Sequence, residues 1–76
     1  MTLKNTIEKL LEKLIVSQSV TEIDQIRGKV NKLLHGKIKV KKLEKWNYFV
    51  DIKLYEIKEN LNLFSGIYLI SLTDDL

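Results

Sequence analysis

The chain has 76 residues, with 13 basic and 10 acidic side chains and a formal net charge of +3. A chain of this length forms one domain with a small core, and the absence of cysteine excludes disulfides and thiolate metal ligands as stabilising links. Its first residues interleave Lys and Glu with Leu and Ile, and no apolar run is long enough to span a membrane. We therefore expect a single cytoplasmic domain over residues 1–76, without a membrane span.

The basic residues are almost all lysines, with Arg27 as the one exception. They are densest between residues 36 and 58, whereas residues 59–76 carry acids and no base. Sequence-specific DNA readers rely on the bidentate contacts of arginine, so this composition argues against that class of protein.

Residues 3–15 have the spacing of an amphipathic helix. Their apolar positions recur every three or four residues and predict a core-facing stripe of Leu3, Ile7, Leu10, Leu11, Leu14 and Ile15. Either Thr2 or Thr6 has the side chain to cap the start of this helix.

A second helix is expected over residues 20–34. Ser19 and Glu22 form a Ser-x-x-Glu capping box at its start. Gly28 lies inside the helix, where it either permits a close approach of a neighbouring element or is a tolerated weak position. His35 and Gly36 favour helix termination, through the dipole and the left-handed region respectively.

The remainder of the chain is interpreted as a small antiparallel sheet. Residues 37–43 and 67–73 alternate apolar with polar side chains, and the central strand is assigned to residues 46–57. Its even positions are apolar and would face the helices: Trp46, Tyr48, Val50, Ile52 and Leu54. The predicted fold is therefore α+β, in the order ααβββ, with both helices on one face of the sheet.

The sequence offers no catalytic set. His35 has no cysteine and no second histidine as a partner, and Asp51 and Glu56 would point to opposite faces of the same strand. No Gly-rich phosphate loop is present. We expect a non-enzymatic protein that uses neither a cofactor nor a metal.

Two surfaces are candidates for binding a partner. The first combines the outer face of the central strand with the apolar loop that follows it, and comprises Phe49, Asp51, Lys53, Tyr55, Leu61, Leu63 and Phe64. The second is a basic ribbon of Lys37, Lys39, Lys41, Lys42 and Lys45. The ribbon either contacts phosphates or an acidic partner, or protects a sheet edge from aggregation, which is the commoner role of such lysines.

Two spaced motifs resemble the gas vesicle protein O family. They are Trp46-x-x-x-Val50-Asp51 and Gly66-x-Tyr68-x-Ile70-x-Leu72-x-Asp74, and the similar region covers residues 30–75. The chain departs from the family in its Leu-rich connection without Pro and in lacking a Tyr/Arg-rich final strand, which leaves a truncated domain of a longer protein as another interpretation. The resemblance implies an accessory protein of gas vesicle assembly that contacts other proteins.

We therefore expect an adaptor that binds another protein, such as a vesicle component, or a second copy of itself. The alternative is a small regulator encoded by a phage or mobile element, which binds a host protein or nucleic acid through the lysine-rich strand. Binding to an oligonucleotide that weakens steeply with salt would favour the alternative.

Overall fold

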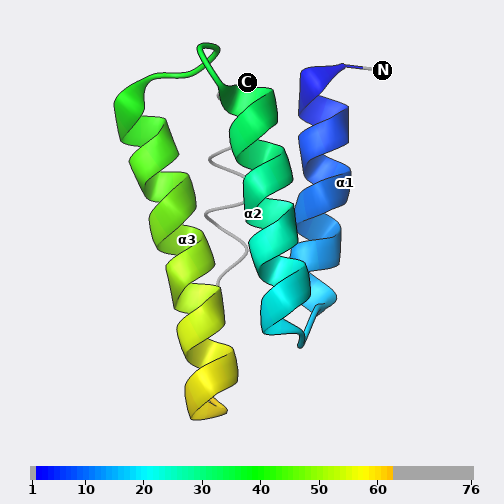
Figure 1. The fold of residues 1–76 in the computed structure, drawn as a ribbon, viewed down its shortest axis with the longest axis vertical. Helices are drawn as coiled ribbons and strands as arrows, with labels where there is room; N and C mark the ends of the chain where they lie inside the picture. The colour runs from blue at the N-terminus through cyan, green and yellow to red at the C-terminus, as the bar shows by residue number, and fades with distance from the viewer. Residues whose placement is uncertain (1, 63–76) are drawn as a thin grey trace.

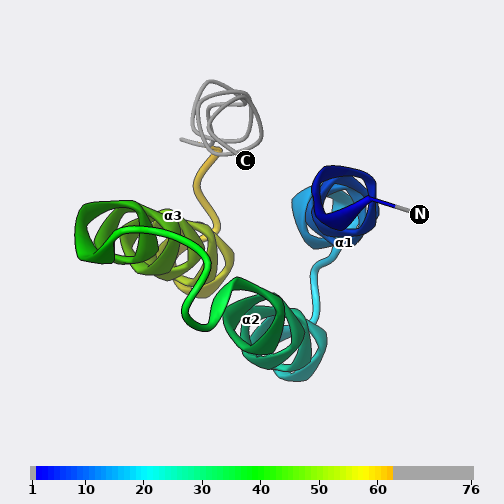
Figure 2. The ribbon, with the colours of Figure 1, turned by 90° about the horizontal axis from the view of Figure 1, so that it is seen from above.

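The computed structural model describes residues 2–62, and this part of the chain consists of three helices and their connections. Helix α1 spans Leu3–Val16, α2 spans Val20–Leu34 and α3 spans Val40–Glu59. Successive helices run in opposite directions, and α2 lies between α1 and α3 (Figures 1 and 2). The described region is therefore an antiparallel helical bundle in which the middle helix packs against both others.

The first helix begins and ends close to the predicted residues. The Thr2 hydroxyl accepts a hydrogen bond of 3.2 Å from the Asn5 amide, so Thr2 rather than Thr6 is the N-cap. Ile7, Leu11 and Leu14 are fully buried and form the stripe that faces the core.

The serine half of the predicted capping box is confirmed at the start of the second helix. The Ser19 hydroxyl accepts a 3.2 Å hydrogen bond from the Glu22 amide. At the other end, His35 is the C-cap and Gly36 adopts a positive φ of 70°, a conformation that glycine takes without the steric penalty of a Cβ. Apart from the backbone of its own helix and its chain neighbours, nothing lies within 4 Å of where a Cβ on Gly28 would be, so Gly28 does not serve a close approach.

The predicted sheet is wrong, because residues 40–59 form the 20-residue helix α3 and no strand occurs in residues 2–62. The segments assigned to two strands and their turn instead form the α2–α3 connection and this helix. The third predicted strand, residues 67–73, lies outside the described residues. The fold of the described region is all-α, not α+β.

Helical spacing accounts for burial along α3 better than alternation does. The buried residues fall three or four positions apart, at Trp46, Phe49, Val50, Lys53 and Glu56. The helix ends at Asn60, whose φ of 59° is left-handed, a conformation that asparagine adopts more readily than most residues.

The core is formed by all three helices. Its buried apolar residues are Ile7, Leu11, Leu14, Ile23, Ile26, Val30, Leu34, Trp46, Phe49 and Val50. Trp46 and Phe49 lie one turn apart on α3, and their rings stack with centroids separated by 5.9 Å.

Candidate interaction surfaces

The outer face of α3 carries an apolar stripe that does not join the core. Tyr48, Ile52 and Tyr55 are spaced by four and three residues, which places them on one side of a helix. Tyr48 is 58% exposed and Tyr55 is 52% exposed. Ile52 is half-buried, yet it is not among the residues packed against the core. We call these three residues the α3 stripe.

Three polar contacts join α2 to α3 next to this stripe. The Trp46 indole N–H donates to the Asn31 side-chain oxygen at 2.8 Å. Arg27 donates to the Asn47 carbonyl at 3.0 Å and forms an ion pair with Asp51. These bonds fix the faces of α3 that meet α2 and the core. Asp51 lies three residues from Tyr48 and four from Tyr55, so the Arg27–Asp51 ion pair borders the stripe.

The residues predicted for partner binding do not form one surface. Phe49 is buried, and Lys53 is buried with its ammonium donating to the Ile15 carbonyl at 3.0 Å. Their assignment to an outer face is wrong, because helical rotation turns both toward the core. Asp51 is exposed and paired with Arg27.

Tyr55 and Leu61 remain accessible members of the predicted set. Leu61 is 44% exposed just beyond the end of α3, whereas Leu63 and Phe64 lie outside the described residues. The sequence interpretation missed Tyr48 and Ile52, which it placed in the core. Their spacing with Tyr55 was the signal that identifies a helical face.

The predicted lysine ribbon is not a strand. Lys37 lies in the α2–α3 connection and Lys39 is the N-cap of α3, while the others occupy its first two turns: Lys41, Lys42 and Lys45. Lys42 is half-buried and the rest are exposed. Because these residues are helical or in a connection, the explanation of the lysines as protection of a sheet edge no longer applies.

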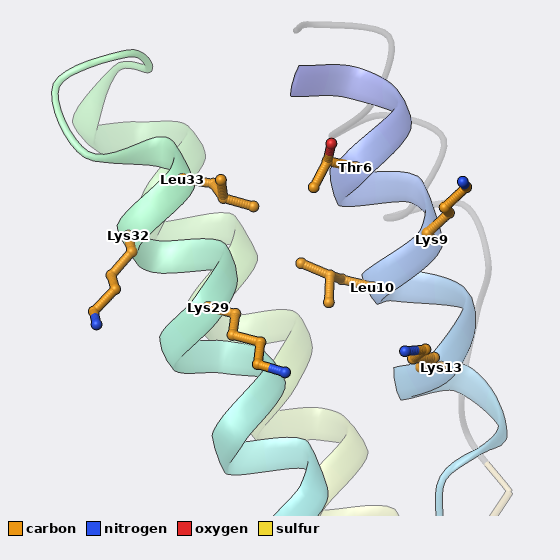
Figure 3. A pocket seen from close by; sticks show the side chains of 7 residues that line it. All are labelled: Thr6, Lys9, Leu10, Lys13, Lys29, Lys32 and Leu33. Carbon is orange, nitrogen blue, oxygen red and sulfur yellow. The ribbon is translucent and has the colours of Figure 1, made fainter. Parts of the chain in front are cut away.

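A second basic site lies in the groove between α1 and α2 (Figure 3). The groove has a volume of about 410 Å³ and is lined by Thr6, Lys9, Leu10, Lys13, Lys29, Lys32 and Leu33. Leu10 and Leu33 point into the gap between the helices. The sequence interpretation did not identify this groove, because its residues come from two helices whose relative rotation is a property of the packing.

The described residues show neither a metal site nor a membrane-spanning helix. No group of three or more His, Asp or Glu side chains in residues 2–62 is arranged to hold a metal ion. None of the helices in this range combines the length and apolar character that crossing a bilayer requires.

Residues 2–62 form a three-helix bundle with two basic surfaces and one apolar stripe. No family model matches the chain, and no curated protein or solved structure matches it either. The resemblance to the gas vesicle protein O family assumes a strand beginning at Trp46, where the chain forms α3. It remains a prediction from the sequence.

Proposed function

We propose that this protein is a non-enzymatic adaptor that acts by protein–protein contact and that the α3 stripe is its contact surface. The observation that carries the proposal is the exposure of two tyrosines with a half-buried isoleucine on one face of a 20-residue helix. Tyrosine is enriched in protein interfaces, because its ring provides a large apolar area and its hydroxyl provides a hydrogen bond.

The spacing of the stripe suits a partner that presents a groove or another helix. Residues at positions i, i+4 and i+7 form a continuous ridge along about two turns, which is the pattern with which amphipathic helices anchor in apolar grooves. Leu61 is exposed beyond the end of α3 and borders a hollow with Glu56 and Ile57, so it is not part of the stripe. The partner is either another protein or a second copy of this chain.

A comparison of two matched variants tests the contact. The triple variant Tyr48→Gln, Ile52→Gln and Tyr55→Gln removes the stripe while retaining residues that favour helices. The control, Val16→Gln with Val20→Gln, removes exposed apolar side chains near the α1–α2 connection, where Val16 is 75% exposed and Val20 is 48% exposed. Circular dichroism establishes that both variants keep the helical content of the wild type.

Light scattering and affinity capture from native lysate then measure self-association and partner binding. We expect the wild type and the control to form the same complex and the stripe variant to lose it. A wild-type protein that stays monomeric and captures no protein, or a stripe variant that binds as well as the wild type, would contradict the proposal.

A role in gas vesicle assembly and a cytoplasmic location are narrower proposals. The first rests on the sequence resemblance alone, and the second rests on the absence of cysteine. Vesicle shell genes next to the gene for this chain would support both.

The second candidate function is a regulator that binds nucleic acid through the lysines around the start of α3. The supporting observation is that Lys37, Lys39, Lys41 and Lys45 are all exposed within one short segment. Phosphate contacts of this kind weaken steeply with salt. Titration of a labelled oligonucleotide at several salt concentrations tests it, and no binding at low salt would exclude it.

A further inference from the structure

We propose that the groove between α1 and α2 is a second binding site, which accepts an acidic peptide segment of a partner protein with one apolar anchor side chain. The site lies on α1 and α2, whereas the stripe lies on α3, so the two surfaces can be occupied and tested independently. A protein with both surfaces could bind two partners at once, whereas the stripe alone accounts for one.

The floor of the groove accounts for the apolar anchor. Leu10 and Leu33 approach each other from the two helices, with Thr6 beside them (Figure 3). The volume of about 410 Å³ is at the lower end of the range of about 300–1,000 Å³ that is typical of ligand pockets. A groove of this volume can take one Leu or Phe side chain with its flanking backbone. In the described part of the chain, Leu10 and Leu33 are the apolar residues that line it.

The rim of the groove accounts for the acidic flanks. Lys9 and Lys13 come from α1, and Lys29 and Lys32 come from α2. Within residues 2–62, none of these four ammonium groups takes part in an ion pair or a side-chain hydrogen bond. Four lysines without an ion partner in residues 2–62 therefore line the groove. Lys29 reaches toward the gap, whereas Lys9 and Lys32 point outward from it (Figure 3).

Among residues 2–62, the acidic side chains on the same helices do not pair with these lysines. Glu8 and Glu12 belong to α1 but do not line the groove. Glu22 borders an adjoining hollow that shares Leu10, Lys13 and Lys29 with it. Glu22 therefore lies beyond the Lys13 and Lys29 side of the groove and borders neither Lys9 nor Lys32 in that hollow.

The size of the charged ring favours a peptide over a nucleic acid. Lys9 and Lys13 are one helical turn apart, which is about 6 Å along the axis, and Lys29 and Lys32 are about 4.5 Å apart by the same rise per residue. Surfaces that bind single strands are extended tracks with aromatic rings on which bases stack. No aromatic residue of the described part lines this groove, and its lysines flank one apolar point on two helices.

The use of lysine, rather than arginine, determines how strictly the site selects the acidic residues of a peptide. An ammonium group is a hydrated point charge on a flexible stem, so it attracts carboxylates without imposing a fixed bidentate geometry. We therefore expect recognition of an apolar residue flanked by Glu or Asp, with tolerance in the spacing of the acids, and an affinity that falls with salt.

Fluorescence anisotropy with a labelled synthetic peptide tests the site. The probe peptide has one central Leu flanked on both sides by Glu, and two comparison peptides replace either the Leu by Ser or each Glu by Gln. We expect the wild-type protein to bind the probe at low salt and to bind each comparison peptide roughly tenfold or more weakly. Methyl NMR shifts of Leu10 and Leu33 on addition of the probe locate the contact.

Two charge-matched protein variants separate the groove from general electrostatics. One changes Lys9, Lys13, Lys29 and Lys32 to Gln, and the other changes Lys37, Lys39, Lys41 and Lys45 to Gln. Both remove the same charge, and we expect only the first to lose roughly tenfold or more in affinity for the probe.

Several outcomes would overturn the proposal. They are the absence of binding by the wild type at low salt, equal loss in both protein variants, and equal binding of the peptide in which Ser replaces Leu. If an oligonucleotide displaces the probe only when the control lysines are intact, the basic surface at the start of α3 is the binding site and the groove is not. Failure of this proposal leaves the α3 stripe untouched, because neither variant alters it.

Discussion

The indole nitrogen of Trp46 lies 2.8 Å from the side-chain oxygen of Asn31, and this hydrogen bond joins the buried face of α3 to α2. Trp46 is 1% exposed, so its N–H has no access to water as an alternative acceptor. A buried donor without a partner costs about 1–3 kcal/mol. Asn31 therefore fixes the orientation of the Trp46 indole in the core.

Asn31→Ala should destabilise the protein by about 1–3 kcal/mol, because the Trp46 N–H then loses its acceptor. The gain in helix propensity from alanine offsets part of this loss. Urea unfolding followed by the fluorescence of the single tryptophan measures the difference. Asn31→Asp is the control, since it keeps an acceptor oxygen at the same position.

NMR offers an independent readout of the same bond. The chain has one tryptophan and therefore one indole N–H signal, and we expect its hydrogen exchange to be slow in the wild type and faster in Asn31→Ala. Equal exchange and equal stability in the two proteins would contradict the role given to Asn31.

The neighbouring aromatic residues Tyr48 and Phe49 distinguish a helix from a strand directly. Phe49 is buried and stacked on Trp46, so Phe49→Ala should cost about 3–5 kcal/mol. Tyr48 is 58% exposed, so Tyr48→Ala should lower the unfolding free energy by less than Phe49→Ala does. Chemical denaturation of both variants is the measurement. If the segment were a strand with Tyr48 inside and Phe49 outside, Tyr48→Ala would lower the unfolding free energy more than Phe49→Ala.

The misassignment of this segment has a specific physical origin. Apolar residues occupy both the alternating positions Trp46, Tyr48 and Val50 and the helical positions Trp46, Phe49 and Val50, so periodicity alone favours neither. Length decides the matter, because residues 40–59 contain no Gly or Pro and exceed an ordinary strand. Burial of Lys53 in the helical register also could not be expected from composition, since lysine is rarely enclosed.

The first two helices were predictable because their signals are local. Thr2, Ser19 and Gly36 act through bonds or dihedral angles within a few residues of themselves. The groove near Leu10 and Leu33 depends instead on how two helices rotate against each other, which is a property of the whole bundle. Surfaces of that kind are not visible in a single sequence.

Two glycine substitutions should change stability in opposite directions. Gly28 is in α2 with open space where a Cβ would lie, so Gly28→Ala should stabilise the protein by about 0.5–1 kcal/mol. Gly36 has a φ of 70°, so Gly36→Ala should destabilise it by about 1 kcal/mol or more. Thermal unfolding of both variants checks the pair, and destabilisation by Gly28→Ala would indicate a contact at that position.

Lys53 links α3 to α1 through a charged hydrogen bond. Its ammonium group donates to the carbonyl of Ile15, in the last turn of α1, where the helix dipole is negative. Lys53→Met keeps most of the apolar stem but leaves that carbonyl without its donor, so we expect a loss of about 1–3 kcal/mol. Lys58→Met in the same helix is the exposed control and should change stability by about 0.5 kcal/mol or less. Desolvation of a buried charge opposes its pairing energy, so a Lys53→Met protein more stable than the wild type would contradict a net stabilising role for this bond.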